Sequence, residues 1–233
     1  MTTTTTPLPP ALAAVYNAML ASVKAATSVH YVATSLETSS AATTRLHFDA
    51  SIGPSAGTNT ATWSASGQKG AFTIIAHGSS IYLKADANSL VTFFELIPAL
   101  NAAKYAGQWI SFSSTDKLYS SLRSDLTMTS VAASLAFRPS AAVTKPSVIV
   151  LRGKPSSSTS TPAGEVATAV TTISRSTKRP ITQTFDASYK GDTELSSIDF
   201  SQWDAATVPG APSSSITWVS ISAAITPSTT AAG

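Results

Sequence analysis

The sequence contains no cysteine. Disulfide bonds, thiolate metal ligands and cysteine nucleophiles are therefore excluded from any account of this protein. The absence does not fix the compartment, because disulfides are common but not universal in exported proteins.

Charged side chains are also scarce. They make up 12% of the chain, about half of the usual share, and the net charge is only +3. The lysines and arginines are scattered and form no long run. A nucleic-acid binder normally shows a dense basic stripe with aromatic residues between the cations, so we expect no nucleic-acid partner.

No segment of the chain approaches the roughly 20 consecutive apolar residues that a transmembrane helix needs. Residues 1–10 contain neither the basic region nor the apolar region of a signal peptide, and they are predicted to form a Thr/Pro-rich tether. A Met directly before such a tether indicates that a natural leader has been replaced. Residues 227–233 are predicted to be a flexible tail.

Sequence signals for catalysis and metal binding are missing as well. There is no Gly-x-Ser-x-Gly elbow and no glycine-rich phosphate loop, so we predict that the protein is not an enzyme and uses no cofactor. His30, His47 and His77 are the three histidines, and they form no His-x-His or His-x-x-x-His pair with a carboxylate, which a metal site would need. We therefore expect no metal site.

What the chain does contain is a large hydrophobic fraction, 43%, among many Ser and Thr residues. Residues 70–86 are typical of a β-hairpin: Phe72 and Ile74 share one face of its first strand, and Ile81 and Leu83 share one face of its second. Such a hairpin cannot bury an apolar face alone. It needs a larger sheet beside it and a covering layer across it.

The rest of the sequence supplies both. Helical spacing after Pro9 and Pro10 predicts a helix over 11–26, and the segment at 87–100 is too apolar for a surface helix. No internal repeat or second core is visible, so we predict one domain over 11–226. The remaining predicted elements are strands at 28–36, 45–52, 58–66, 109–112, 147–151, 165–174, 181–190 and 194–200, helices at 115–122 and 129–137, a flexible loop at 154–164 and an added strand at 216–225.

Several short motifs resemble a known family, over roughly residues 11–212. They are Ala-Ala-Thr-Ser-Val-His at 25–30, the hairpin strand ending in Tyr-x-Lys at 82–84, Gly-x-Trp at 107–109, Arg-Pro at 179–180 and Asp-Phe-Ser-Gln-Trp at 199–203. The chain resembles the periplasmic lipoprotein carriers of the LolA type and, more closely, the LppX/LprG-like lipoproteins of actinobacteria. This resemblance implies an α+β fold, a curved antiparallel β half-barrel with capping α-helices.

The resemblance also implies an apolar cavity for acyl chains between sheet and helices, and transport of a lipid or lipidated ligand in the cell envelope. Family members are often anchored through a lipidated N-terminal Cys, which this chain lacks. The implied partners are a lipid or acylated small molecule and the membrane surface, and the protein is expected to be a monomer in the periplasm or at the cell surface. Residues 216–225 extend past the usual end of the family.

The expected ligand-binding residues are apolar side chains of the strands and of the 87–100 segment: Phe48, Trp63, Phe72, Ile74, Ile81, Leu83, Leu90, Phe93, Phe94 and Ile97. A lipid site needs no hydrogen-bonding motif, because each buried methylene contributes ~0.8 kcal/mol. The same residues are equally suited to a solid core. The alternative function is therefore a structural or protein-interaction module of the cell surface without a lipid ligand.

Overall fold

The computed structural model describes residues 8–155 and 166–225. The predicted tail at 227–233, most of the predicted tether and most of the predicted loop at 154–164 lie outside these ranges. The first half contains α1 (Pro10–Lys24), β1 (Val29–Thr38), β2 (Thr43–Ile52), β3 (Ala56–Ala65), β4 (Gln68–His77), β5 (Ser80–Ala85), the π-helix η1 (Ser89–Phe93), α2 (Ala99–Tyr105) and β6 (Trp109–Phe112). The second half contains α3 (Tyr119–Ser124), α4 (Met128–Ser134), β7 (Phe137–Thr144), β8 (Val148–Pro155), β9 (Val166–Ser174), β10 (Pro180–Tyr189), β11 (Asp192–Ser201), β12 (Ile216–Thr217) and α5 (Trp218–Ile225).

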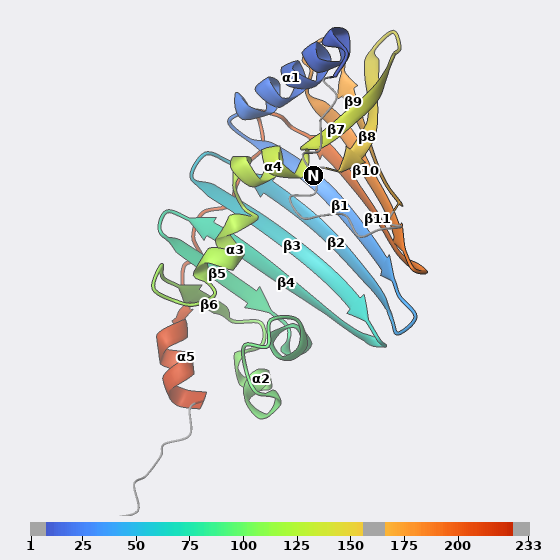
Figure 1. Cartoon of the computed structure of the whole chain (residues 1–233). Helices are drawn as coiled ribbons and strands as arrows, with labels where there is room; N and C mark the ends of the chain where they lie inside the picture. The colour runs from blue at the N-terminus through green and yellow to red at the C-terminus, as the bar shows by residue number, and fades with distance from the viewer. Residues whose placement is uncertain (1–7, 156–165, 226–233) are drawn as a thin grey trace, which may run out of the picture.

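The described strands form one 12-stranded sheet in the order β12-β6-β5-β4-β3-β2-β1-β11-β10-β9-β8-β7. Every neighbouring pair is antiparallel except β12 and β6. The antiparallel pairing of β1 with β11 joins the two meanders, with Tyr31 opposite Phe200. The sheet is curved, and α1, α4 and α3 lie along one of its faces (Figure 1). The predicted α+β fold with a curved antiparallel sheet is confirmed.

We call the face that these helices cover the inner face, and the opposite one the outer face. Strand alternation sends apolar side chains inward: Phe48, Ala61 and Phe72 are consecutive partners across β2, β3 and β4. Their neighbours in the chain, such as His47 and Thr62, point outward. The inner face is buried in two hydrophobic clusters, and α1 covers the smaller one by placing Leu12 and Met19 over strands β7 to β9.

The 87–100 segment covers the inner face next to β4, as predicted, and it is fastened there by Trp63. The indole Nε1 donates a hydrogen bond of 2.8 Å to Ser89 Oγ. A Cβ atom at Gly70 would lie 2.5 Å from the indole nitrogen and would also collide with Ser89 Oγ. Only glycine at position 70 therefore lets the indole lie across β4 and reach the π-helix.

The predicted strand at 216–225 is wrong. Only Ile216 and Thr217 pair with β6, and α5 follows directly. Trp218, Ile221 and Ile225 pack against the main cluster, and their spacing of three and four residues is that of one helix face. Stacking of the Trp218 ring on Phe112, with 5.9 Å between the ring centroids, holds the helix against the sheet edge.

Two other boundaries differ from prediction. The helix expected at 129–137 ends at Ser134, and Phe137 instead begins β7, a strand that the sequence did not predict. The helix expected at 115–122 begins only at Tyr119. The apolar segment 87–100, for which no element type was predicted, contains the π-helix η1 and the start of α2.

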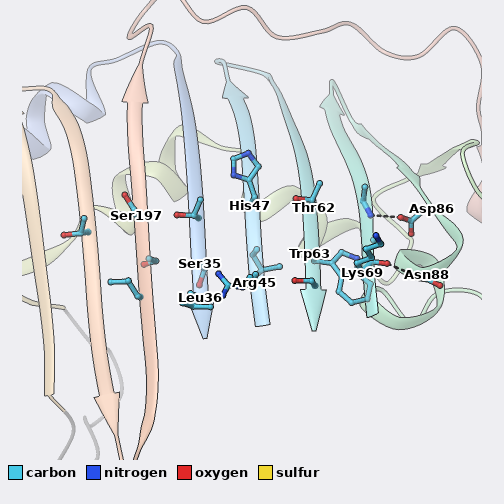
Figure 2. Close-up of a pocket in the computed structure, with 18 of the residues that line it drawn as sticks. Ser35, Leu36, Arg45, His47, Thr62, Trp63, Lys69, Asp86, Asn88 and Ser197 are labelled. Carbon is cyan, nitrogen blue, oxygen red and sulfur yellow. Dashed lines mark hydrogen bonds between the residues drawn. The ribbon is translucent and has the colours of Figure 1, made fainter. Parts of the chain in front are cut away.

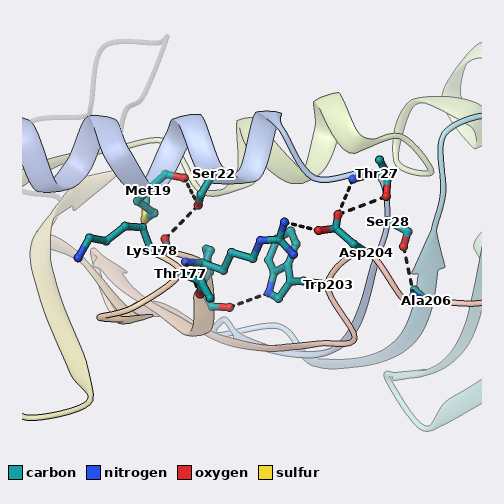
Figure 3. Close-up of polar contacts among 11 residues, drawn as sticks. Met19, Ser22, Thr27, Ser28, Thr177, Lys178, Trp203, Asp204 and Ala206 are labelled. Carbon is teal, nitrogen blue, oxygen red and sulfur yellow. Dashed lines mark hydrogen bonds and ion pairs between the residues drawn. The ribbon is translucent and has the colours of Figure 1, made fainter.

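Polar contacts of Trp203 and Asp204 hold the start of the connection from β11 to β12 in place (Figure 3). Asp204 accepts hydrogen bonds from the Thr27 amide, at 2.8 Å, and from the Arg179 guanidinium. The same guanidinium lies 5.7 Å from the centroid of the Trp203 ring, whose Nε1 donates to the Pro180 carbonyl. These contacts tie the end of β11 to the end of α1 and to the start of β10.

Candidate functional site

The inner face carries a cavity of about 420 Å³ between the sheet and the α3–α4 segment. Its apolar lining comes from strands β1, β2 and β11 and from α4: Tyr31, Ala33, Leu46, Phe48, Val131, Ile198 and Phe200. Its polar lining consists of Thr34, Ser35, Asn59, Asp125, Ser130, Ser134, Glu194 and Ser196. The lining therefore combines aromatic and aliphatic walls with a smaller set of hydrogen-bonding groups.

Small side chains on β1 explain why space remains at this place. Ala33 stands between Phe48 of β2 and Ile198 of β11, and Ser35 stands between Leu46 and Ser196. The larger neighbours on both sides support α4, of which Val131 is buried against the cluster. The short side chains between them leave the centre unfilled.

Asn59 provides an unusual polar group in this lining. The residue is only 9% exposed, and its Oδ1 atom has no hydrogen-bond partner among the described residues. A buried acceptor without a donor costs about 1–3 kcal/mol. Because this oxygen is itself buried, a donor that enters the cavity reaches it only if the Asn59 amide turns toward the ligand.

Acidic groups set the charge of the cavity. Asp125 and Glu194 are the only charged side chains in its lining, among the residues that the structure describes. Burial, and secondarily the negative charge of Asp125, raise the pKa of the Tyr31 phenol to about 12, so the phenol is neutral at physiological pH. The cavity thus presents hydroxyl groups, one amide and negative charge, and no cation.

The structure places the residues predicted to bind a ligand in two groups, one in the inner-face cavity and one in the packed core. Phe48 lines the inner-face cavity. Trp63, Phe72, Phe93 and Phe94 instead pack ring against ring, with centroid separations of 4.8 to 5.8 Å. The remaining predicted residues are buried in the same hydrophobic cluster: Ile74, Ile81, Leu83, Leu90 and Ile97. Their binding role stays a prediction.

Sequence reasoning did not select Tyr31, Leu46, Val131, Ile198 or Phe200. Leu46 shares the alternating pattern of Phe48, so the same pattern could have identified it as a residue of the inner face. Ile198 and Phe200 belong to the cavity only because β11 pairs with β1, which the local sequence does not encode.

A larger hollow, of about 1230 Å³, lies on the outer face (Figure 2). Side chains of β1 to β4, β10 and β11 line it, among them Thr34, Leu36, Arg45, His47, Thr62, Ser64, Lys69, Thr184, Leu195 and Ser197. It is larger than the inner-face cavity, and its polar lining combines hydroxyl groups with the cations Arg45 and Lys69, His47, one amide and one carboxylate, Asp86. Volume alone therefore does not decide which hollow holds a hydrocarbon chain.

The histidines stay apart from one another. His30 Nδ1 lies 3.2 Å from Ser51 Oγ and 3.7 Å from an oxygen of Asp49. Within residues 8–155 and 166–225, no group of three or more metal-ligating side chains comes together. In those same ranges no helix has the length and apolar character to span a bilayer.

No protein-family model matches the chain, and no curated protein does. Among solved structures, LprF from Mycobacterium bovis matches with a TM-score of 0.51 and 14% identity, over 88% of this chain and 99% of LprF. The lipoprotein LppX from Mycobacterium tuberculosis gives 0.47 and 15%, over 84% and 96% of the two chains. A LolA superfamily protein from Nitrosomonas europaea gives 0.31 and 12%, over 85% and 94%. The likeness to LprF shows a shared fold, and the predicted resemblance is confirmed at that level.

Proposed function

We propose that the protein binds an acyl lipid in the inner-face cavity and carries it within the cell envelope, outside the cytoplasm, without catalysing a reaction. The observation that carries this proposal is the cavity itself, which lies between an apolar sheet face and α4. Its volume of about 420 Å³ falls within the range of about 300–1000 Å³ that is usual for ligand sites. The partners are the lipid and the membrane surface that supplies it.

The driving force for binding is the removal of hydrocarbon from water. Each methylene that enters the apolar lining contributes ~0.8 kcal/mol, against which the loss of translational and conformational freedom must be set. Phe48, Ile198 and Phe200 form the walls that such a chain would contact. This mode of binding needs no catalytic group and no metal.

The polar lining selects the headgroup. Oδ1 of Asn59 requires a donor, and the charge of Asp125 disfavours an anionic group nearby. A headgroup with hydroxyl donors and no negative charge satisfies both conditions. We therefore propose a neutral, hydroxyl-bearing acyl lipid as the ligand class.

A fluorescent monoacylglycerol tests the proposal. We expect it to bind at micromolar concentration, and we expect Ser134→Trp to abolish binding because the indole fills the cavity that Ser134 borders. Ala133→Trp is the matched control, since Ala133 is exposed on the same helix and does not line the cavity. Circular dichroism checks that both variants remain folded. Equal binding by both variants, or no binding by the parent protein, contradicts the proposal.

The second candidate is a solid-core module of the cell surface without a lipid ligand. The observation in its favour is the direct packing of Phe72 on Phe93 and Phe94, at 4.9 and 4.8 Å, where a ligand space was expected. Native mass spectrometry after mild purification separates the two candidates. A lipid adduct that Ser134→Trp removes supports the carrier, and a bare chain that binds no added lipid supports the module.

A further inference from the structure

The outer face carries an ordered row of side chains that the lipid cavity does not use. The pairing register aligns five residues across β11, β1, β2, β3 and β4, in the order Leu195, Leu36, Arg45, Ser64 and Lys69. All of them line the 1230 Å³ hollow. Beyond Leu195 the same row continues to Asp186 of β10, which does not line the hollow. Within the hollow, the row is therefore apolar at one end and basic at the other.

The apolar end is exposed. Leu195 is a large hydrophobic side chain with 52% of its surface exposed, and Leu36 beside it is half-buried. Arg45 and Leu195 are separated by β1 alone, so their Cα atoms stand about 10 Å apart at the usual strand spacing. An alkyl chain of that length laid along the row would cover both leucines.

The basic end holds two cations without an acidic partner. Neither Arg45 nor Lys69 forms an ion pair with any residue in the described ranges. They are separated by β3 alone, and the Ser64 hydroxyl lies between them. Long side chains about 10 Å apart at their Cα atoms can converge on one anion. His47 and Thr62 stand in the adjacent row.

One acidic residue borders the hollow, and its oxygens are occupied. Asp86 Oδ2 accepts from the Ala71 amide at 2.6 Å, and Oδ1 accepts from the Ser89 amide at 2.7 Å. Figure 2 shows the Asp86 carboxylate turned toward β4 through one of these bonds. Within the described residues Asp86 forms no ion pair with Lys69 of the neighbouring strand or with Arg45, which is two strands further along the sheet.

We propose that this outer-face row is a binding site for a single-chain anionic amphiphile. Its anionic headgroup contacts Arg45 and Lys69, and its alkyl chain lies over Leu36 and Leu195. The charge of this site is opposite to that of the inner-face cavity, whose charged lining residues are Asp125 and Glu194. The two hollows therefore take different ligands, and this site does not depend on the proposed lipid carriage.

Dodecyl phosphate, below its critical micelle concentration, is the probe, and calorimetric titration of the full chain is the measurement. We expect one bound molecule, with affinity that falls as salt is added. The double variant Arg45→Gln/Lys69→Gln should weaken binding by at least about tenfold, since hydrogen bonds to charged groups are lost. Leu195→Ser should weaken it by about threefold or more. Lys117→Gln, a change of an exposed cation outside the hollow, should leave it unchanged.

Three results would overturn the proposal. The first is that the double variant binds dodecyl phosphate as tightly as the parent protein does. The second is that inorganic phosphate binds the parent protein as tightly as dodecyl phosphate does, which indicates an adventitious ion only. The third is that dodecyl maltoside binds as tightly as dodecyl phosphate, which removes the role of charge. Retained binding by Ser134→Trp, in which the inner-face cavity is filled, supports the outer-face location. All the substituted positions are on the exposed surface, so the variants should fold.

Discussion

At the scale of single residues, Asn59 is the side chain whose environment fits least well with a purely structural role. It lies on the inner face of β3, in the row of Ala50 and Ile74, where its neighbours across the sheet are apolar. An amide at such a position lowers the stability of the empty protein unless a donor reaches it. Stability and ligand binding should therefore respond to Asn59 in opposite directions.

Asn59→Leu tests this expectation. We expect the free energy of unfolding to rise by about 1 kcal/mol, because a side chain of similar shape removes the unsatisfied acceptor. We expect monoacylglycerol to bind less tightly, because the donor from its headgroup loses its partner. Urea denaturation and fluorescence titration measure the two effects. Asn17→Leu, on the exposed side of α1, is the control and should change stability by less than about 0.5 kcal/mol. A less stable Asn59→Leu protein would contradict the expectation.

The period-2 pattern predicted which strand residues point inward, but it did not predict how far the interior is filled. Phe72 was expected on the inner face and lies there, yet Phe93 and Phe94 occupy the space in front of it. Ala33 and Ser35 create the open region only because α4 bridges above them. Which buried position faces a void depends on how closely segments far apart in the sequence pack against each other. The alternation within one strand carries no information on the separation between the sheet and the segment that covers it.

At the scale of elements, long alternating strands and the Ala-rich helix were predictable, whereas β7 and α5 were not. Residues 140–144 of β7 are exposed, so the strand shows no apolar alternation beyond its first residues. It is an edge strand, held by pairing with β8 and by Phe137 packing under α1. Residues 216–225 are rich in Ile and Val, which favour strands in isolation, but the contact of Trp218 with Phe112 selects a helix.

The connection after β11 is the element whose stability should depend on pH. The pKa of the Asp204 carboxyl is lowered, first by the hydrogen bond from the Thr27 amide and next by that from Arg179. A lowered pKa means that the stabilisation is complete above the ordinary carboxyl pKa of 3.8 and is lost as the pH falls through the lower folded-state value. Because Asp204 is 41% exposed, solvent screening limits the effect to about 1 kcal/mol or less.

Asp204→Asn should therefore be less stable than the parent protein at pH 7, with a difference that stays constant down to about pH 5 and closes below about pH 4. Denaturant unfolding at a series of pH values measures the difference. Asp199→Asn, on an exposed position of β11, is the control and should show no such closing. A gap that persists at low pH would mean that Asp204 acts only through the shape of its side chain.

At the scale of the whole molecule, the fold was predictable through short motifs and through the order of helix, strands, helical insertion and strands. The pairing of β1 with β11, which joins the two meanders into one sheet, was not readable from local sequence. Val29 to Thr38 pairs with a strand more than 150 residues later, and that pairing alone brings Ile198 and Phe200 beside Phe48. The predicted cavity therefore exists on the expected face, but it is centred on β1 rather than on the 70–86 hairpin.

This arrangement places two hollows back to back on one sheet. Four residues border both of them, because only strand backbone separates the two faces at this place: Thr34, Ser35, Leu46 and Ser196. The inner-face cavity is lined by Asp125 and Glu194, and the outer-face row presents Arg45 and Lys69. Because the two hollows open on opposite faces of the sheet and differ in charge, the two ligands should not compete.

We therefore expect monoacylglycerol and dodecyl phosphate to bind the same chain at once. Native mass spectrometry with both ligands present should show a complex of one chain with one molecule of each. Filling the inner-face cavity with Ser134→Trp should remove only the monoacylglycerol, and Arg45→Gln/Lys69→Gln should remove only the dodecyl phosphate. Displacement of one ligand by the other in the parent protein would mean that both enter the same hollow. The affinity of that hollow for each ligand in the two variants would then identify which face it belongs to.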